Sequence, residues 1–594
     1  MDRTGIIVVS LCVVLLGAWF LQQQKYAQQQ ARFQATNQVA RVLAPNPGEL
    51  SSQPNAAVNV ASAPAAVFDT NTPEQLLILT NARARYTFTS WGGGLKSVEL
   101  LDYPETISPR WKKTVTANGV ATLNTRAPLP VLAILGDASV VGDGIFTLTP
   151  TADGVRVEKS LTNGMRIAKE FHLSSNYLVN ASVRLENSSD KPLTLPAQEW
   201  VVGTATPMGP DDNGMNEGAL WFNGTSAVDQ PVAWFSGGGF GCFKSSPRSE
   251  YLAGSNNVVW AAVHNQFFAL MAMPKTNEPA LQIIARPVNL PPFPNIEPIP
   301  GAPPPQGIQT AVIYPTATLA AHQAIEHQIA IFAGPKEYRL LAHIGEEFQN
   351  QADLVMQFGK YSGFFAKALL LAMNWLHDVT RLGYGWTIVL ITVIIKVLFW
   401  PLTAASTRSM KRMQLLAPEM KALKEKYKDD MQKFTQKQWE LYRKHKVSPM
   451  SGCLPMVIQM PVFIGFFMMI RSAIELRGAH FLWITDLSKP DTLFMIPGTH
   501  FPFNLLPLLM GGSMLWQSHL TPPSPGMDPA QQKIMRYMPL MFLVFLYSYS
   551  SGLALYWTVN NVLTVVQTKL TKMNQAPVEP AVVSALTPLS KRKK

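Results

Sequence analysis

A lysine lies inside a run that is apolar enough for a membrane helix. The run extends from Trp386 to Pro401, and Lys396 lies five residues before that proline. A lysine near the middle of a bilayer costs roughly 2.5–3.5 kcal/mol on insertion scales, and such residues usually face water or a partner. Alternatively, the ammonium group reaches the interface along its own methylene chain. Lys396 is therefore either a charge in a wet groove or an anchor near a helix end.

The other apolar runs contain no acidic partner for this lysine. None of the five predicted membrane segments after residue 384 contains Asp or Glu, whereas a proton- or sodium-coupled transporter usually carries a carboxylate near the midplane. The sequence also lacks the internal repeat that many transporter folds show. Hydroxyl and amide side chains could make a groove polar, although such groups more often bond neighbouring helices. They are Thr392, Gln459, Ser513, Gln517, Asn560, Asn561 and Gln567.

The first half of the chain shows no recognisable active site. Gly238–Gly241 is no phosphate loop, because no Lys-Ser/Thr follows it. Asp211–Gly214 resembles half a calcium loop, but a methionine occupies the next ligand position. His264 has no nearby nucleophile or ligand pattern, and the three cysteines lie far apart. We therefore expect no enzyme activity, no metal site and no cofactor.

Composition changes along the chain predict a series of domains. Net charge is +12 and charged residues make up 15% of the chain, which is low for a soluble protein. We therefore expect a membrane protein with an all-β sandwich domain outside the membrane. The predicted segments are a signal-anchor helix at 1–21, a flexible linker at 22–70, the β-sandwich at 71–340, connecting and interfacial amphipathic helices at 341–384, a membrane core at 385–572 and a basic tail at 573–594.

Six transmembrane helices are predicted, the first being the anchor. Long apolar runs of this kind are candidates for spans. The other five lie at about 385–403, 453–472, 504–520, 534–550 and 553–570. A basic helical hairpin at 404–446 separates two of them, and the positive-inside rule places it in the cytoplasm. Both termini are then cytoplasmic, and residues about 22–384 are external.

Two groups of residues on these elements are candidates for binding. Basic side chains on the hairpin could meet ribosomal RNA, lipid or a targeting receptor, namely Arg408, Lys411, Arg412, Lys424 and Lys428. Met and Phe gather on the spans at 453–472 and 534–550, where flexible apolar side chains could repack around varied apolar partners. The alternative is that they simply face lipid. These residues are Met460, Phe463, Phe467, Met541 and Phe545.

Several short motifs in the membrane core carry a family resemblance. They are Pro449–Pro455 (PMSGCLP), Ile458–Pro461 (IQMP), Ile474–Arg477 (IELR), Trp483–Leu487 (WITDL), Asp528–Met535 (DPAQQKIM) and Ser551–Trp557 (SGLALYW). Residues 380–570 resemble the YidC-type membrane protein insertases, whose relatives also serve mitochondria and chloroplasts. The large external domain with an N-terminal anchor is similar to the form found in Gram-negative-type bacteria, which implies a periplasmic domain and the inner membrane.

The resemblance implies a five-helix insertase core around a hydrophilic groove that is open to cytoplasm and lipid. The family's groove arginine corresponds to Lys396, which keeps the charge but lacks the bidentate fork of arginine. The threonine one turn earlier corresponds to Thr392. The aromatic residue of the last span corresponds to Trp557 or Tyr556, and Gln517 is a further groove residue.

The function that the resemblance implies is insertion and folding of nascent inner-membrane proteins, alone or beside a translocon. Its partners would be nascent membrane proteins, the Sec translocon, the ribosome, the signal-recognition-particle receptor and membrane lipids, with no small-molecule cofactor. Two other classes stay open at this point. One is a small-solute transporter or channel with Lys396 as an anion site, and the other is an assembly scaffold that binds through its external domain.

Overall fold

The computed structural model describes residues 72–573 apart from 108–118, 210–211, 213, 215, 237–245, 276–279, 294–303, 360–361, 429, 446, 448–453, 498–500, 521–536 and 538–540. The expected anchor at 1–21, the linker at 22–70 and the tail after residue 573 lie outside the described residues. The chain divides into two compact units, and each is described by itself. A β-rich unit runs to Lys360 and also contains Arg471–Gly478, while a helical unit contains Tyr361–Ile470 and the chain from Ala479 onward.

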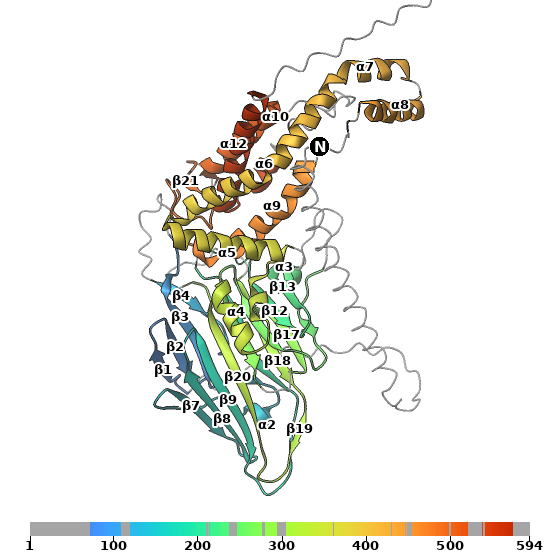
Figure 1. The fold of residues 1–594 in the computed structure, drawn as a ribbon. Helices are drawn as coiled ribbons and strands as arrows, with labels where there is room; N and C mark the ends of the chain where they lie inside the picture. Colours follow the sequence, from blue (N-terminus) through green and yellow to red (C-terminus); the bar gives the residue numbers. More distant parts are fainter. Residues whose placement is uncertain are drawn as a thin grey trace, which may run out of the picture. The chain divides into compact units, whose positions relative to one another are not determined.

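A nine-stranded antiparallel sheet forms the larger layer of the β-rich unit (Figure 1). In sheet order its strands are β13 (Ala227–Pro231), β12 (Gly218–Phe222), β15 (Trp260–His264), β16 (Phe268–Pro274), β20 (Ala324–Pro335), β9 (Leu178–Asn187), β8 (Met165–Leu173), β7 (Gly154–Ser160) and β6 (Thr147–Pro150). The strands β7, β8 and β9 alternate buried and more exposed positions, as expected for a sheet with one face on the core. The strands β12, β15 and β16 are buried along almost their whole length.

A five-stranded antiparallel sheet packs against it, with β11 and β18 on β15 and β16. Its order is β14 (Tyr251–Ala253), β17 (Gln282–Asn289), β18 (Gln306–Tyr314), β11 (Gln198–Ala205) and β5 (Ile134–Leu135). The remaining elements of this unit are a four-stranded sheet of β1 (Leu76–Thr80), β2 (Ala84–Thr89), β3 (Gly94–Pro104) and β4 (Val120–Leu123), a ribbon of β10 (Leu193–Leu195) and β19 (Ala317–Leu319), and the short helices α2 (Ala138–Val141) and α3 (Val232–Ser236).

A lysine occupies one position of the buried row of β8. Ile167, Lys169 and Phe171 alternate along this row and are all fully buried. The Lys169 Nζ donates to the carbonyl oxygens of Gly92 (2.9 Å), Gly93 (2.8 Å) and Leu132 (2.8 Å). All three ammonium protons therefore have acceptors, which is what makes a buried lysine tolerable. This lysine joins the sheet to two loops and is a structural residue.

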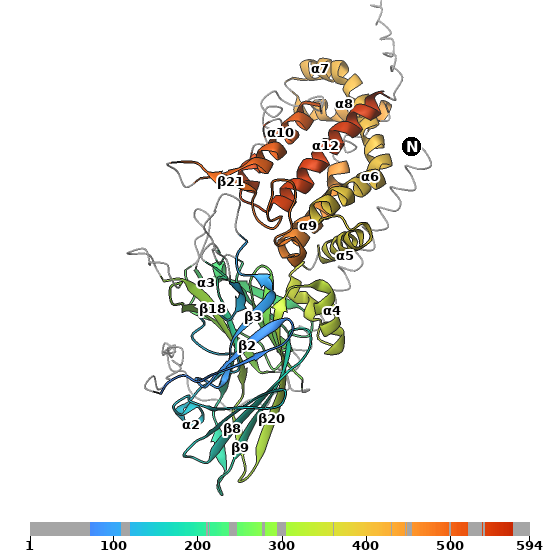
Figure 2. The same ribbon diagram turned by 90° about the vertical axis from the view of Figure 1, so that its left-hand side faces the viewer.

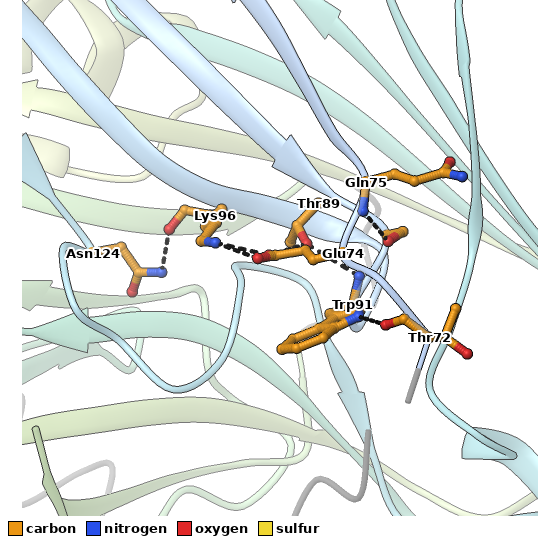
Figure 3. Close-up of polar contacts among 8 residues, drawn as sticks. Thr72, Glu74, Gln75, Thr89, Trp91, Lys96 and Asn124 are labelled. Atoms are coloured by element: carbon orange, nitrogen blue, oxygen red, sulfur yellow. Dashed lines mark hydrogen bonds and ion pairs between the residues drawn. The ribbon is translucent and has the colours of Figure 1, made fainter. Parts of the chain in front are cut away.

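The start of the described chain is fastened to the four-stranded sheet (Figure 3). The Lys96 ammonium donates to both carboxylate oxygens of Glu74, at 2.8 and 2.6 Å. The Thr89 hydroxyl donates to the same carboxylate (2.6 Å), and the Trp91 indole donates to the Thr72 carbonyl (3.2 Å). These bonds join the segment from Thr72 to Gln75 to the strands β2 and β3 and to the residues between them.

Two segments complete the β-rich unit. After β20, the chain forms α4 (Tyr338–Glu347) and the 3-10 helix η1 (Ala352–Met356). The segment Arg471–Gly478, which includes the 3-10 helix η3 (Ile474–Leu476), belongs to this unit although it follows a helix of the other one. The Arg477 guanidinium donates to the carbonyls of Pro104 (2.6 Å) and Glu105 (3.0 Å) and lies 5.4 Å from the ring centre of Phe268.

The helical unit contains the long apolar helices (Figure 2). The helix α12 packs against both α6 and α10, and α5 packs against α6. A helical turn without a label of its own covers residues 541–546, and a short ribbon precedes α10. The elements are α5 (Gly363–Thr380), α6 (Tyr384–Leu415), α7 (Ala417–Lys426), α8 (Met431–Lys444), α9 (Leu454–Ser472), β21 (Thr492–Met495), β22 (Pro502–Asn504), α10 (Leu505–Leu520) and α12 (Ser551–Met573).

The helix α6 continues past the point where the sequence predicts the end of a span. The expected span stops near residue 403, but the helix extends through Pro401 to Leu415. A proline removes the backbone donor at its own position and crowds the carbonyl one turn earlier, and membrane helices tolerate both effects. The first part of the expected hairpin region is therefore a continuation of α6, and only α7 and α8 form the hairpin itself.

Membrane spans can be compared with the sequence only in part. Within the described ranges, α6 is the single helix that is a candidate to cross a membrane by its length and composition. The span expected at about 534–550 is described only at residue 537 and from residue 541 onward. The count of six spans stays a prediction, whereas a sheet-rich domain followed by a helical C-terminal region is what the structure has.

Candidate functional site

One face of α12 carries a row of polar side chains. Asn560, Thr564 and Gln567 recur at intervals of four and three residues, which places them on the same side of the helix. Asn561 stands beside them and is 3% exposed. Each of these four side chains forms a hydrogen bond with a side chain of α6, α9 or α10. This polar seam runs through the interior of the helical unit.

Lys396 lies on α6 and reaches the seam. Its side chain is buried, at 8% exposure, and its ammonium donates to the Thr564 hydroxyl at 2.8 Å. That hydroxyl in turn donates to the Asn560 carbonyl at 2.7 Å. An ammonium has three protons to donate, and among the described residues Lys396 has this one acceptor. Two donors are thus left for water or for a bound group.

The remaining bonds of the seam hold helices together. The Gln459 amide of α9 donates to the Asn560 side-chain oxygen at 2.6 Å. The Asn561 amide donates to the Ser513 hydroxyl of α10 at 3.1 Å, and the Gln567 amide donates to the Thr403 hydroxyl of α6. These amides therefore act as contacts between helices, which is the more common role of such groups in membrane bundles.

The aromatic residues of α12 pack on α9. The Trp557 ring meets Phe463 edge-on at 4.5 Å between ring centres and lies 5.8 Å from Phe542. The Tyr556 ring is stacked on Phe466 at 4.1 Å and is 2% exposed. Tyr556 is therefore a core residue of the helical unit, and Trp557 is half-buried.

Two other predicted groove residues differ in their surroundings. Thr392 is 1% exposed, and its hydroxyl donates to the Ile388 carbonyl of its own helix at 2.6 Å. This bond saturates its donor, so Thr392 offers only an oxygen to a ligand. Gln517 is half-buried on α10. The structure thus brings Lys396 to α12 but gives Thr392 a local partner.

The predicted apolar path lies partly on the surface of the helical unit. Met460 is 42% exposed, Met541 is 52% exposed and Phe545 is 68% exposed. Phe463 and Phe467 are less open, because Phe463 meets Trp557 and Phe467 lies 5.7 Å from the ring of Tyr549. The path is therefore a set of exposed methionine and phenylalanine side chains beside a shielded aromatic cluster.

The bundle is closed at the end where α12 begins. Leu487 is fully buried, and its carbonyl accepts from the Gly552 amide at 2.8 Å. The Ser551 amide donates to the Lys489 carbonyl (2.8 Å), and its hydroxyl donates to the Asp486 carbonyl (3.0 Å). The loop before β21 therefore caps this end of the helices.

Comparisons with known proteins decide the family. Family models described as "60Kd inner membrane protein" and "YidC periplasmic domain" match residues 375–577 and 78–372. A "Membrane protein insertase YidC" of Citrifermentans bemidjiense is 32% identical over 495 residues, which are 81% of this chain and 82% of that relative.

The chain belongs to the YidC family of membrane protein insertases.

Two further relatives carry the same name. The one from Syntrophus aciditrophicus is 29% identical over 547 residues, covering 89% of this chain and 91% of its own length. The one from Nitrosococcus oceani is 43% identical over 257 residues, covering 43% of this chain and 44% of its own length. The resemblance read from the motifs is confirmed, and so is a periplasmic domain in front of a helical inner-membrane region. A transporter or channel is not favoured.

The basic hairpin of this YidC-family chain packs around a small apolar core, to which Met413 of α6 also contributes. Buried Met420 of α7 packs with Phe434 and Tyr442 of α8. The Asp430 side chain caps α8 by accepting from the Lys433 amide at 3.0 Å. Arg408, Arg412, Lys424 and Lys428 are exposed, while Lys411 lies in α6 but its side chain is outside the described ones. The hairpin thus presents its charges around a folded apolar centre.

The periplasmic domain contains buried ionisable groups that the sequence did not single out. Glu217 is 1% exposed, and within the described part of the chain neither carboxylate oxygen has a hydrogen-bond partner. Burial raises the pKa of Glu217 to about 9. His264 lies 3.0 Å from Asp229 and 3.2 Å from the Lys336 ammonium, and burial lowers the pKa of Lys336 to about 7. Among the residues described, no group of three His, Cys, Asp or Glu could hold a metal ion.

Sequence reasoning missed the partner of the key lysine. Thr564 was not singled out, because a threonine in a membrane helix is common and usually bonds its own backbone. The available signal was its spacing, since it lies four residues after Asn560 and three before Gln567. That periodicity marks one helix face, and any polar residue on it is a candidate for the seam.

Proposed function

We propose that this insertase admits the polar flank of a nascent membrane protein beside Lys396 and releases its apolar segment into lipid. The process needs no covalent chemistry, because transfer of an apolar segment from water to lipid is itself favourable. A polar group at membrane depth is costly when it has no partner. The role of the seam is to supply such partners during passage.

The observation that carries this proposal is the incomplete hydrogen bonding of Lys396. Its ammonium is buried, has no acidic neighbour in the predicted spans and donates only to Thr564 among the described residues. An acidic side chain or a backbone carbonyl of a client would fill the two remaining donor positions. The charge also favours clients with acidic residues in the translocated part.

The apolar path then follows the exposed side chains Met460, Met541 and Phe545, with Phe463 and Phe467 beneath them. Thioether and phenyl side chains can contact many different apolar sequences. Thr392, Gln517, Trp557 and Tyr556 complete the proposed groove. Tyr556 would have to leave its stacking partner in order to contact a client.

The basic hairpin and tail are proposed to meet the machinery that delivers clients. The exposed Arg408, Arg412, Lys424 and Lys428, together with Lys411, suit anionic RNA, lipid headgroups or an acidic receptor surface. The proposed partners are the ribosome and the signal-recognition-particle receptor, and the Sec translocon for larger clients. This assignment rests on charge and on the family.

The proposed orientation has both termini in the cytoplasm and residues about 22–384 in the periplasm. It combines six spans, including the anchor at 1–21, with the basic hairpin inside. Membership of an inner-membrane family supports it, and so does the run of basic residues at the C-terminus.

Crosslinking to a stalled nascent chain tests the proposed site. A photoreactive residue placed at position 396, 460 or 545 should crosslink to the apolar segment or its flank. Position 397 is the matched control, because Val397 is 62% exposed and adjacent in sequence. Equal yields from 396 and 397, or no product from 396, would contradict the proposal.

Reconstituted liposomes separate insertion from transport. A short single-span client should become protected from protease only when the protein is present, with no accompanying flux of small anions. Anion flux without insertion would favour the channel reading instead.

A further inference from the structure

A short β ribbon at one end of the helical unit exposes an apolar surface. The ribbon consists of β21 and β22, which pair antiparallel directly before α10. Phe494 is 46% exposed, Met495 36% and Phe501 52%. Leu482, at the tip of a nearby turn with a left-handed φ of 51°, is 60% exposed. We call these four side chains the apolar rim.

Polar atoms at the base of the ribbon form hydrogen bonds. The Tyr547 hydroxyl donates to the Pro502 carbonyl at 2.7 Å and accepts from the Asn504 amide at 3.1 Å. The Asn504 side chain donates to the Tyr547 carbonyl at 2.8 Å and accepts from the Thr492 hydroxyl at 2.7 Å. The base is thereby held firmly, and the apolar rim is left on the outside.

Aromatic stacking packs two of the four rim side chains against neighbouring rings. Phe494 is stacked on Phe503 at 4.9 Å with planes 10° apart, and Phe501 is stacked on Tyr547 at 5.2 Å. An isolated two-stranded ribbon is only marginally stable in water. An exposed group of large apolar side chains marks a surface that something covers.

The surroundings point to lipid as the cover. No Asp, Glu, Lys or Arg occurs from Thr492 to Leu520. The ribbon ends at Asn504, and α10 begins at the next residue, with Leu508 and Leu509 39% and 45% exposed. The apolar surface of the ribbon is therefore continuous in the chain with that of a membrane helix, and aromatic residues favour the boundary layer of a bilayer.

A second aromatic pair lies at the same end of the bundle. Trp386 at the start of α6 is 51% exposed and meets Phe481 edge-on at 5.1 Å. Phe481 directly precedes Leu482 of the rim. On the ribbon side, the Asp491 carboxylate accepts from the Trp483 indole (3.0 Å) and from the Leu506 amide of α10 (2.7 Å). The rim is thus connected to the starts of both helices.

We propose that the apolar rim is an interfacial anchor, which lies among the headgroups and upper acyl chains and fixes the depth of this end of the bundle. The proposal needs only the membrane location of the family. The choice of the outer leaflet rests on the proposed orientation. The alternatives are that a second copy of the chain covers the rim, or that a segment of a client protein does.

Depth-resolved photolabelling of the unmodified, full-length protein tests the anchor. The protein is reconstituted in phosphatidylethanolamine–phosphatidylglycerol bilayers that contain a diazirine lipid, with the diazirine either just below the glycerol or at the end of the acyl chain. The shallow probe should label the ribbon at least about threefold more than the deep probe, because the rim lies in the boundary layer. The deep probe should label α10. Absence of shallow labelling on the ribbon overturns the proposal.

Two paired variants give the specificity control. Phe494→Glu with Phe501→Glu should lower shallow labelling of Met495 and Leu482 several-fold, whereas Phe494→Trp with Phe501→Trp should keep it. Hydrogen exchange of α10 reports whether the charged pair still folds. Unchanged labelling in a folded charged pair overturns the anchor. So does a rim-to-rim crosslink between copies, or lipid labelling that a stalled client abolishes.

Discussion

The Lys396 ammonium donates to a hydroxyl and has no carboxylate beside it. A hydroxyl provides one acceptor and no compensating charge, so this contact orients the lysine without neutralising it. A carboxylate of a client protein would add both a further acceptor and a compensating negative charge. The residue is thereby suited to brief contacts with acidic clients, because nothing in the predicted spans competes for its charge.

Replacing Lys396 should separate charge from hydrogen-bond geometry. Lys396→Arg should leave insertion nearly unchanged, since the positive charge is kept. Lys396→Ala should slow insertion of clients with acidic external tails by roughly tenfold, equivalent to about 1.4 kcal/mol. Clients with neutral tails should respond less. Protease protection of the two client types measures both effects.

The neighbouring surface residue supplies the control for that series. Val397→Ala changes an exposed side chain one position away and should leave both client types unaffected. Normal insertion of acidic clients by Lys396→Ala would show that the lysine serves the fold and not the client.

Glu217 makes a pH-dependent contribution that disfavours folding at neutral pH. Its pKa is raised from 4.5 to about 9, so the folded protein keeps a proton that the unfolded chain loses. The contribution is favourable below pH 4.5 and falls as pH rises towards 9. Glu217→Gln should therefore stabilise the periplasmic domain by roughly 2–3 kcal/mol at pH 7, and the gain should grow up to pH 9.

Hydrogen exchange of the full-length protein at pH 6 and pH 8 measures the Glu217 effect. Glu99→Gln is the matched control, because it removes a carboxylate that pairs with exposed Arg85 at 2.8 Å. Such surface pairs contribute at most about 1 kcal/mol. A destabilised Glu217→Gln would mean that the carboxylate has a partner in the folded protein.

Residue types were predictable from the sequence, and their partners were not. Lys396 was evident because a charge in an apolar run is rare. Thr564 and Glu217 were not, because neither type is unusual where it occurs. Their importance arises from burial and from tertiary neighbours, which depend on helices and strands far apart in the chain.

At the scale of elements, the hairpin of α7 and α8 packs around a small apolar core that also includes Met413 near the end of α6. Its core has few members, and Met420 is fully buried at the centre. Met420→Ala should cost about 2–4 kcal/mol, typical of a buried methionine, and raise hydrogen exchange across both helices. Met431→Ala on the same hairpin should have little effect, since Met431 is 73% exposed. Equal effects of the two would refute a distinct core.

Apolar runs of the sequence coincide with helices in the described part of the helical unit, but they do not give the helix ends. The sequence places spans near α6, α9, α10 and α12 because long apolar stretches dominate there. It ends the first of these near Pro401, whereas α6 runs on to Leu415. A proline is a weak stop signal in such a helix, because one lost backbone bond is small beside the many that remain.

For the whole molecule, we expect the two units to have separable tasks. The proposed groove and apolar path lie entirely in the helical unit. Removing residues 75–335 while keeping the anchor should therefore leave insertion of a short single-span client largely intact. A protease-protection assay in cells depleted of the native insertase measures it, and loss of all insertion would favour the scaffold reading.

The deletion removes hydrogen-bond acceptors of one side chain that is kept. Arg477 bonds the carbonyls of Pro104 and Glu105, which the deletion removes. A version that also carries Arg477→Gln avoids leaving a guanidinium without these acceptors. The two deletion variants should insert the client equally well if Arg477 serves only the β-rich unit.

The sequence did not predict that the β-rich unit is discontinuous. Short alternating runs and turns mark most of its strands. The segment Arg471–Gly478 carries no strand pattern, and its membership depends on contacts with loops made long before it. Local signals do not encode such pairing.

The segment Arg471–Gly478 is made late, and its position in the chain determines when the β-rich unit can be completed. The Arg477 contact to Pro104 joins residues 373 apart in the chain. A ribosome adds roughly 5–20 residues per second, so the partner of that loop emerges about 20–75 seconds after it. Until then, the carbonyls of Pro104 and Glu105 lack their contact with the Arg477 guanidinium. The β-rich unit is therefore finished only after α9 has been made, which links its completion to the insertion of this insertase itself.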